Sequence, residues 1–89
     1  MRAIITVVGT DKVGIIAKVS TLLCENGINI LDITQTIMQD MFTMIMLVDF
    51  EKSESDVKSI SEKLDVIAKE MELSIHVQRE ELFQSMHRI

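Results

Sequence analysis

Residues that serve redox, metal and nucleophilic chemistry are scarce in this chain. Among 89 residues there are one cysteine, Cys24, and two histidines, His76 and His87, with no tryptophan or tyrosine. One cysteine excludes an internal disulfide and fits a reducing cytoplasm. Metal sites and catalytic cysteine–histidine pairs need several groups at suitable spacing. We therefore expect no metal, no cofactor and no catalytic residue, and we interpret Cys24 as a buried or half-buried structural thiol.

Clusters of positive charge and long apolar runs are also missing. Nine scattered Lys and Arg face fourteen Asp and Glu, which gives a formal net charge of −5. Nucleic acids and anionic membranes require clustered positive charge, so neither is expected as a partner. No apolar run approaches the ~20 residues that cross a bilayer, and the first residues do not resemble a secretion signal. The expectation is a cytoplasmic domain over residues 1–79, with residues 80–89 as a tail of the same domain.

Hydrophobic residues make up 47% of the chain, and their spacing predicts its elements. The β-branched run at 3–8 indicates a central strand, and the three-four spacing of 13–26 and 57–71 indicates helices. Gly27 is placed as the left-handed residue after the first helix, and Ser53 or Ser55 as the cap of the second. The other predicted elements are strands at 28–38, 41–50 and 73–77, a turn at Gln39–Asp40, and an amphipathic helix at 80–89.

The order strand, helix, strand, strand, helix, strand predicts an α+β fold of the ferredoxin-like βαββαβ type. It has an antiparallel four-stranded sheet with two helices on one face, followed by a short C-terminal helix. Within 28–38, alternation places Ile28 and Ile30 on the face of Asp32, opposite Leu31 and Ile33. The strands at 3–8 and 41–50 are apolar on both sides. The face without helices is therefore expected to be covered by the tail helix, by another subunit, or by both.

The stretch "GTDKVG", residues 9–14, joins a strand to a helix but has neither the Walker nor the dinucleotide pattern. Free amides at a helix start favour an anion such as a carboxylate. Gly14 in the first helical turn is unfavourable by roughly 0.5–1 kcal/mol relative to alanine, so its missing side chain needs a reason. Either a ligand or neighbouring backbone approaches those amides, or helix and strand pack closely there. Asp11 is a candidate helix cap.

The stretch "ITVVGTDKVGIIAKVSTLLCENGINILDITQT" resembles the first half of an ACT domain, whose pattern is a strand, Gly-x-Asp-x-Pro-Gly, a helix and Gly-x-Asn-Ile. The corresponding residues are Gly9, Asp11, Gly14, Gly27, Asn29 and Ile30. The resemblance extends over roughly residues 2 to 79 and is strongest to the stand-alone single-ACT-domain proteins of bacteria and archaea. Those continue with "NI-x-D-x-x-Q", which Asp32 and Gln35 match here.

The resemblance implies a non-catalytic regulatory domain that binds an amino acid or related small metabolite at a homodimer interface. Asp11, Lys12, Val13 and Gly14 of one subunit would line one wall, and Asn29 and Ile30 of the other subunit would line the second. Val13 replaces the family's usual proline, which leaves the loop less fixed. Two alternatives remain. One is a structural or protein-interaction module without a ligand. The other resembles the tandem-ACT glycine-cleavage regulators and controls a transcription factor by protein contact.

Overall fold

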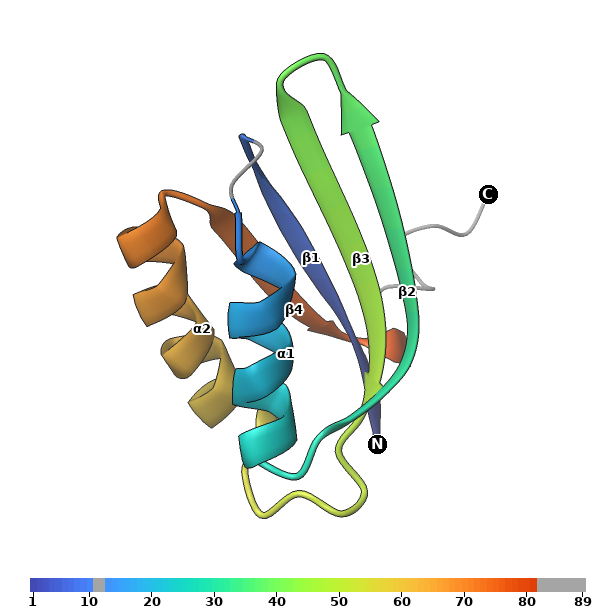
Figure 1. The fold of residues 1–89 in the computed structure, drawn as a ribbon. Coiled ribbons are helices and arrows are strands. Elements are labelled where there is room, and N and C mark those ends of the chain that lie inside the picture. Colours follow the sequence, from blue (N-terminus) through green and yellow to red (C-terminus); the bar gives the residue numbers. More distant parts are fainter. Residues whose placement is uncertain (11–12, 82–89) are drawn as a thin grey trace.

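Four strands and two helices follow one another in the predicted order. The computed structural model describes residues 1–10 and 13–81, and the elements are β1 (Arg2–Thr10), α1 (Ile15–Glu25), β2 (Asn29–Met38), β3 (Met41–Asp49), α2 (Val57–Met71) and β4 (Ser74–Arg79) (Figure 1). All neighbouring strands are antiparallel, in the order β2-β3-β1-β4. The ferredoxin-like fold is therefore confirmed. The predicted tail helix lies, from residue 82 onward, outside the described residues.

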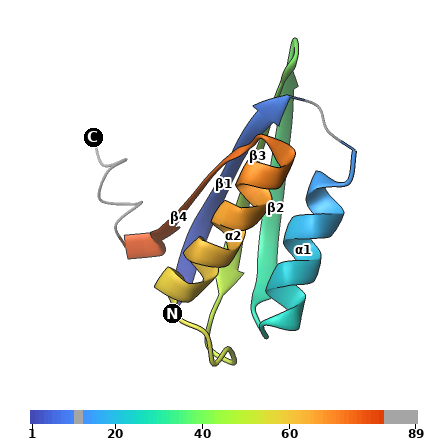
Figure 2. The same cartoon turned by 90° about the vertical axis from the view of Figure 1, so that its left-hand side faces the viewer.

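Both helices cover the same face of the sheet (Figure 2). The hydrophobic core lies between this pair of helices and the sheet. Alternate residues of β1 and β3 point toward the helices, because side chains of a strand alternate between its two faces. Val19 and Leu23 of α1 and Ile60 and Leu64 of α2 meet them at helical spacing. The largest fully buried side chains among the described residues are Ile5, Val7, Val19, Leu23, Met44, Met46, Val48, Ile60 and Leu64.

The start of α1 differs from the prediction. The helix begins at Ile15, and Gly14 is its N-cap in a left-handed conformation, with φ at 88°. Gly14 therefore lies before the first turn, and the predicted helix start at residue 13 is wrong. The predicted capping residue, Asp11, lies outside the described residues. A side chain at Gly14 would meet no atom within 4 Å, so close helix–strand packing is not the reason for this glycine. The reason is the positive φ, which residues with a Cβ adopt at a cost.

The end of α1 and both ends of α2 are also fixed by specific residues. Gly27 has φ at 73°, and the Ile28 amide donates to the Leu23 carbonyl at 2.9 Å, as predicted for a left-handed helix end. The side chain of Asp56, rather than Ser53 or Ser55, caps α2 by accepting from the Ser59 amide at 2.8 Å. At its other end, Glu72 adopts a left-handed conformation.

A bulge in β2 corrects the predicted faces of that strand. The pairing with β3 is regular except between Ile30 and Asp32, where Leu31 is the extra residue. An extra residue reverses the alternation beyond it. Ile30 and Ile33 therefore both pair with core residues of β3, Val48 and Met46, although they are three positions apart. The prediction that Ile30 shares a face with Asp32 is wrong.

The sheet face without helices is apolar only at its centre. Ile4 is 9% exposed and Ile45 is 38% exposed, and both belong to the two central strands, as predicted. The outer strands contribute polar side chains to this face, because the register places Thr34 and Thr36 of β2 and His76 of β4 there. In the described part of the chain, no helix has the length and apolar character needed to cross a membrane.

Candidate functional site

The first part of the predicted ligand site is the start of α1. Gly14 makes no side-chain capping bond, so among the described residues the first amides of the helix have no side-chain acceptor. Val13 is fully exposed beside it. Nothing lies within 4 Å of a Cβ added to Gly14, so a side chain at this position would meet open space. The helix dipole and free amides make this end suitable for a carboxylate. Asp11 and Lys12 lie outside the described residues.

A groove continues from Gly14 along α1. It has a volume of about 510 Å³, and it lies between the first turns of α1 and the side chains of Gln35, Ile37 and Phe42 on the sheet. Ile16 and Ile37 are exposed apolar side chains on its two walls. The groove therefore links the helix start to the outer edge of β2.

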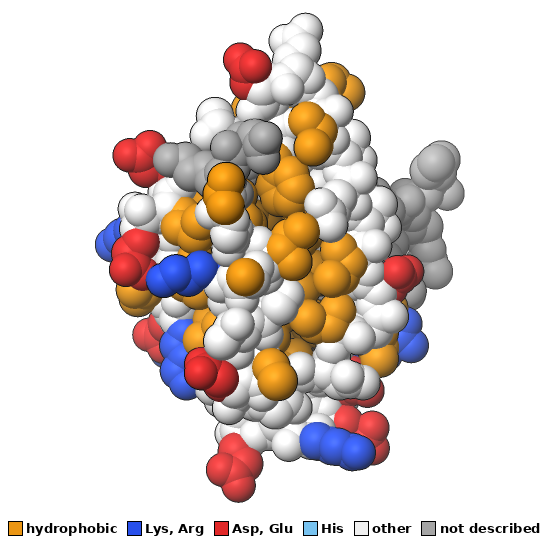
Figure 3. Space-filling model, in the orientation of Figure 1, with side chains coloured by type: hydrophobic (Ala, Val, Ile, Leu, Met, Phe, Trp, Pro, Cys, Tyr) orange, Lys and Arg blue, Asp and Glu red, His pale blue; other side chains and the backbone are white. Residues whose placement is uncertain are grey.

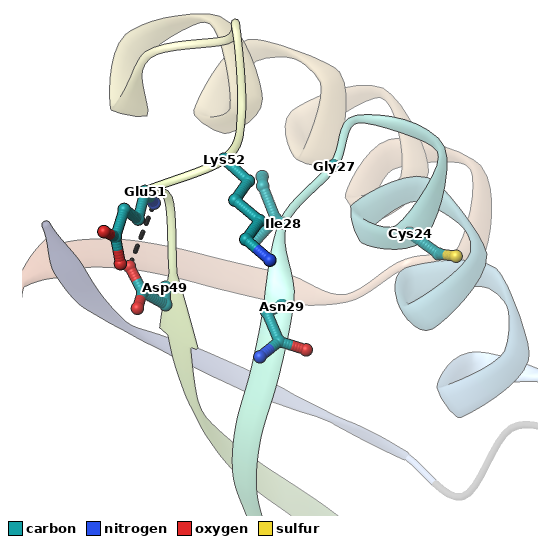
Figure 4. Close-up of a pocket in the computed structure, with 7 residues that line it drawn as sticks. All are labelled: Cys24, Gly27, Ile28, Asn29, Asp49, Glu51 and Lys52. Carbon is teal, nitrogen blue, oxygen red and sulfur yellow. Dashed lines mark hydrogen bonds between the residues drawn. The ribbon is translucent and has the colours of Figure 1, made fainter.

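The second part of the predicted site is the start of β2. Asn29 is the first residue of the strand and is exposed, whereas the Ile30 side chain is half-buried against the core. Asn29 lines a pocket of about 390 Å³ (Figure 4). Its remaining lining residues come from the end of α1, the α1–β2 turn, the end of β3 and the β3–α2 loop: Cys24, Gly27, Ile28, Asp49, Glu51 and Lys52.

Within one chain the two parts lie apart. Gly14 precedes α1, and Asn29 follows the turn that ends it, so the helix separates them, as Figure 1 shows. Eleven helical residues span about 16 Å, which exceeds the length of an amino acid. Val13 and Gly14 therefore lie at one end of α1, and Asn29 and Ile30 lie beyond its other end. Within a single chain these two halves of the predicted ligand site do not meet.

The residues that could serve nucleophilic or metal chemistry do not form a common site among the described residues. Cys24 is exposed, so the expectation of a buried or half-buried thiol is wrong. The buried stripe of α1 runs through Val19 and Leu23, and Cys24 follows Leu23 on the outer side. His76 is exposed on β4, and its Nε2 lies 3.3 Å from the Ser74 hydroxyl oxygen. In residues 1–10 and 13–81, no three His, Cys, Asp or Glu side chains form a metal-binding group.

Sequence reasoning missed Lys52 and the acidic residues beside Asn29. Asp49 ends β3, and Glu51 and Lys52 lie in the loop after it, all of them distant from Asn29 along the chain. Gly27 provided a partial signal, because a Cβ there would come within 3.3 Å of the Lys52 carbonyl oxygen. The sequence explains Gly27 equally well by its helix-ending role, so that tight contact could not be inferred.

The fold defines a small ferredoxin-like domain whose first helix begins without a side-chain cap from its N-cap residue. The model of the ACT domain family matches residues 2–78. The UPF0237 protein of Clostridium perfringens is 54% identical to this chain over the full length of both. The UPF0237 protein of Methanococcus maripaludis is 51% identical over 99% of this chain and 98% of its own length. The structure of an ACT domain protein from Streptococcus pneumoniae has a TM-score of 0.81 at 37% identity, over 93% of each chain.

The chain belongs to the ACT domain family and, within it, to the UPF0237 group of single-domain proteins from bacteria and archaea. ACT domains are small-molecule regulatory modules that often form dimers.

Proposed function

We propose that this chain is a non-catalytic regulator that binds an amino acid or related small metabolite between two copies of itself in the cytoplasm. Asp11, Lys12, Val13 and Gly14 of one copy face Asn29 and Ile30 of the other. Ligand binding changes how the dimer acts on a separate regulated protein. The observation that carries the proposal is the separation of Gly14 from Asn29 by the full length of α1, because only a second copy can bring such groups together.

The free edge of β2 supports a dimer. β2 is an outer strand of the sheet, and most of its residues are exposed. Edge strands usually carry protective charges, yet Asp32 is the one charged residue among the ten of β2. The exposed apolar side chains at this edge and on the adjacent α1 surface include Ile16, Leu31, Ile37 and Met38. In Figure 3 hydrophobic side chains gather over the side formed by α1 and β2, with charged side chains mainly at its margins.

Antiparallel pairing of β2 with β2 of a second copy would complete the site. A twofold axis across this edge reverses the direction of the partner strand. The start of β2 in one copy then lies near the end of β2 in the other, where the groove leads to Gly14. A carboxylate on the helix-start amides and the donor and acceptor of the Asn29 amide together suit an amino acid.

A charge at the β2 edge tests the proposal. Ile37→Asp places a carboxylate on the paired strand, whereas Val66→Asp makes the same kind of change on α2, at a side chain that is 59% exposed against 62% for Ile37. We expect Ile37→Asp to be a monomer in sedimentation equilibrium and to lose amino-acid binding in calorimetric titrations with an amino-acid panel. Val66→Asp should keep both properties. A wild-type monomer at high concentration, or no binding of any amino acid, would contradict the proposal.

A further inference from the structure

We propose that Lys52 is an anion-binding residue of the shared ligand site, and that the site prefers an acidic amino acid over a neutral one. This ligand class rests on the proposed function, because Lys52 lines the same pocket as Asn29. The acidic side chain of the ligand would meet Lys52, and its α-carboxylate would meet the helix start of the second copy.

The direction of the Lys52 side chain supports this role. In Figure 4 it extends from the β3–α2 loop past Ile28, and its ammonium nitrogen lies toward Asn29. The carboxylates of Asp49 and Glu51 point to the other side of the pocket. In the described part of the chain Asp49 pairs with the N-terminal ammonium of Met1 and Glu80 pairs with Arg2, so neither carboxylate is paired with Lys52. The lysine charge is therefore directed at the pocket instead of being neutralised by its acidic neighbours.

The backbone that carries Lys52 is held in place by the end of α1. The Ser53 amide donates to the Phe50 carbonyl at 2.9 Å, which closes a turn around Glu51 and Lys52. The Ser53 hydroxyl donates to the Asn26 carbonyl at 2.6 Å. Gly27 has no side chain to block this approach, and an added Cβ would lie 3.3 Å from the Lys52 carbonyl oxygen. A fixed loop loses less conformational freedom when a ligand binds, so Lys52 is partly preorganised.

The pocket is lined by the carboxylates of Asp49 and Glu51 and by the Lys52 ammonium, so an anionic group is favoured only at the side of Lys52 and Asn29, away from those carboxylates. Asp49 already accepts from the Glu51 amide at 2.9 Å and lies 3.7 Å from the N-terminal ammonium. Lys52 is the one cation among the pocket's lining residues. A carboxylate placed between Lys52 and the Asn29 amide would accept charge-assisted hydrogen bonds from both and would form an ion pair with Lys52, which a neutral side chain cannot form. With the helix start of the second copy, the site offers two anion-binding ends.

Calorimetric titration of the full chain with L-aspartate, L-glutamate, L-serine and L-valine tests this inference. We expect the better acidic ligand to bind about tenfold tighter than either neutral one, in line with the strength of charge-assisted hydrogen bonds. Lys52→Gln should abolish that preference without shifting the thermal unfolding midpoint. Lys58→Gln removes an exposed charge on α2 outside the pocket and should keep the preference.

Two results would overturn the inference while leaving the proposed function intact. One is equal or tighter binding of the neutral amino acids by the wild-type chain. The other is an acidic preference that survives in Lys52→Gln. If none of these ligands and no other amino acid binds, the proposed function and the inference both fail.

Discussion

At the scale of single residues, the structural reason for glycine differs between position 14 and position 27. Both have positive φ, but a Cβ on Gly14 would be in open space, whereas one on Gly27 would press on the Lys52 carbonyl. We expect Gly14→Ala to lower the free energy of unfolding by about 1 kcal/mol, the cost of the left-handed backbone for a residue with a Cβ. Gly27→Ala should cost more because the same strain is joined by a tight contact. Urea denaturation of both variants measures the difference.

Gly14→Asn is the matched control for backbone strain. Asparagine tolerates the left-handed region better than alanine, so this variant should be more stable than Gly14→Ala. If Gly14→Ala and Gly14→Asn are equally stable, or if both match the wild type, then positive φ does not explain the glycine.

Asn26 and Asn29 are three residues apart but have separable roles. The Asn26 side chain donates to the Leu22 carbonyl at 2.7 Å and accepts from Lys63 at 2.8 Å and from Ser55 at 3.2 Å. The bonds with Leu22 and Ser55 are partly buried, and the one with Lys63 is exposed. Asn26→Ala should therefore lower the free energy of unfolding by about 2 kcal/mol, since a typical hydrogen bond contributes roughly 0.5–1.5 kcal/mol.

Asn29→Ala provides the contrast, because Asn29 is exposed and lines the pocket. We expect its urea denaturation curve to match the wild type and its amino-acid binding to be weakened at least tenfold, the effect of one good polar contact. The separation of roles is wrong if Asn29→Ala is the less stable variant or if it binds ligand normally.

At the scale of elements, the sequence was sufficient wherever a local pattern decides the structure. The spacing from Val57 to Met71 predicts α2 with its observed bounds, and the β-hairpin turn lies at Gln39–Asp40, where Gln39 has φ at 53°. The start of α1 was misplaced because the φ of Gly14 cannot be read from hydrophobic spacing. The faces of β2 were misassigned because a one-residue bulge leaves no local signal.

The candidate site shows the same division between local and long-range determinants. The helix start and Asn29 were predictable from a motif and a resemblance, and the structure places them at opposite ends of α1. Lys52 was not predictable, since its place beside Asn29 depends on the packing of the β3–α2 loop against the α1–β2 turn. Such a contact joins segments that are distant in sequence, and no spacing rule reveals it.

At the scale of the whole molecule, the two sides of the sheet face different environments. The helices seal one side, while the other has an apolar centre formed by β1 and β3. A domain of this size buries a modest share of its surface, so each uncovered apolar side chain matters for stability. The sequence predicts that this face is covered by the tail helix, by another subunit, or by both. Residues 82–89 carry four apolar side chains at helical spacing, Leu82, Phe83, Met86 and Ile89, so we expect the tail to contribute to that cover.

Removal of residues 82–89 tests that prediction independently of the ligand site. We expect the shortened chain to unfold with a free energy lower by on the order of 2 kcal/mol, the contribution of one well-buried large apolar side chain. The dimer and amino-acid binding should persist, because β2 and β4 are opposite edges of the sheet. Phe83→Asp should reproduce the loss of stability in the full chain, and Gln84→Asp should not. An unchanged unfolding curve would show that the tail contributes nothing to this face, and a monomeric shortened chain would place the dimer contact at the tail and not at the β2 edge.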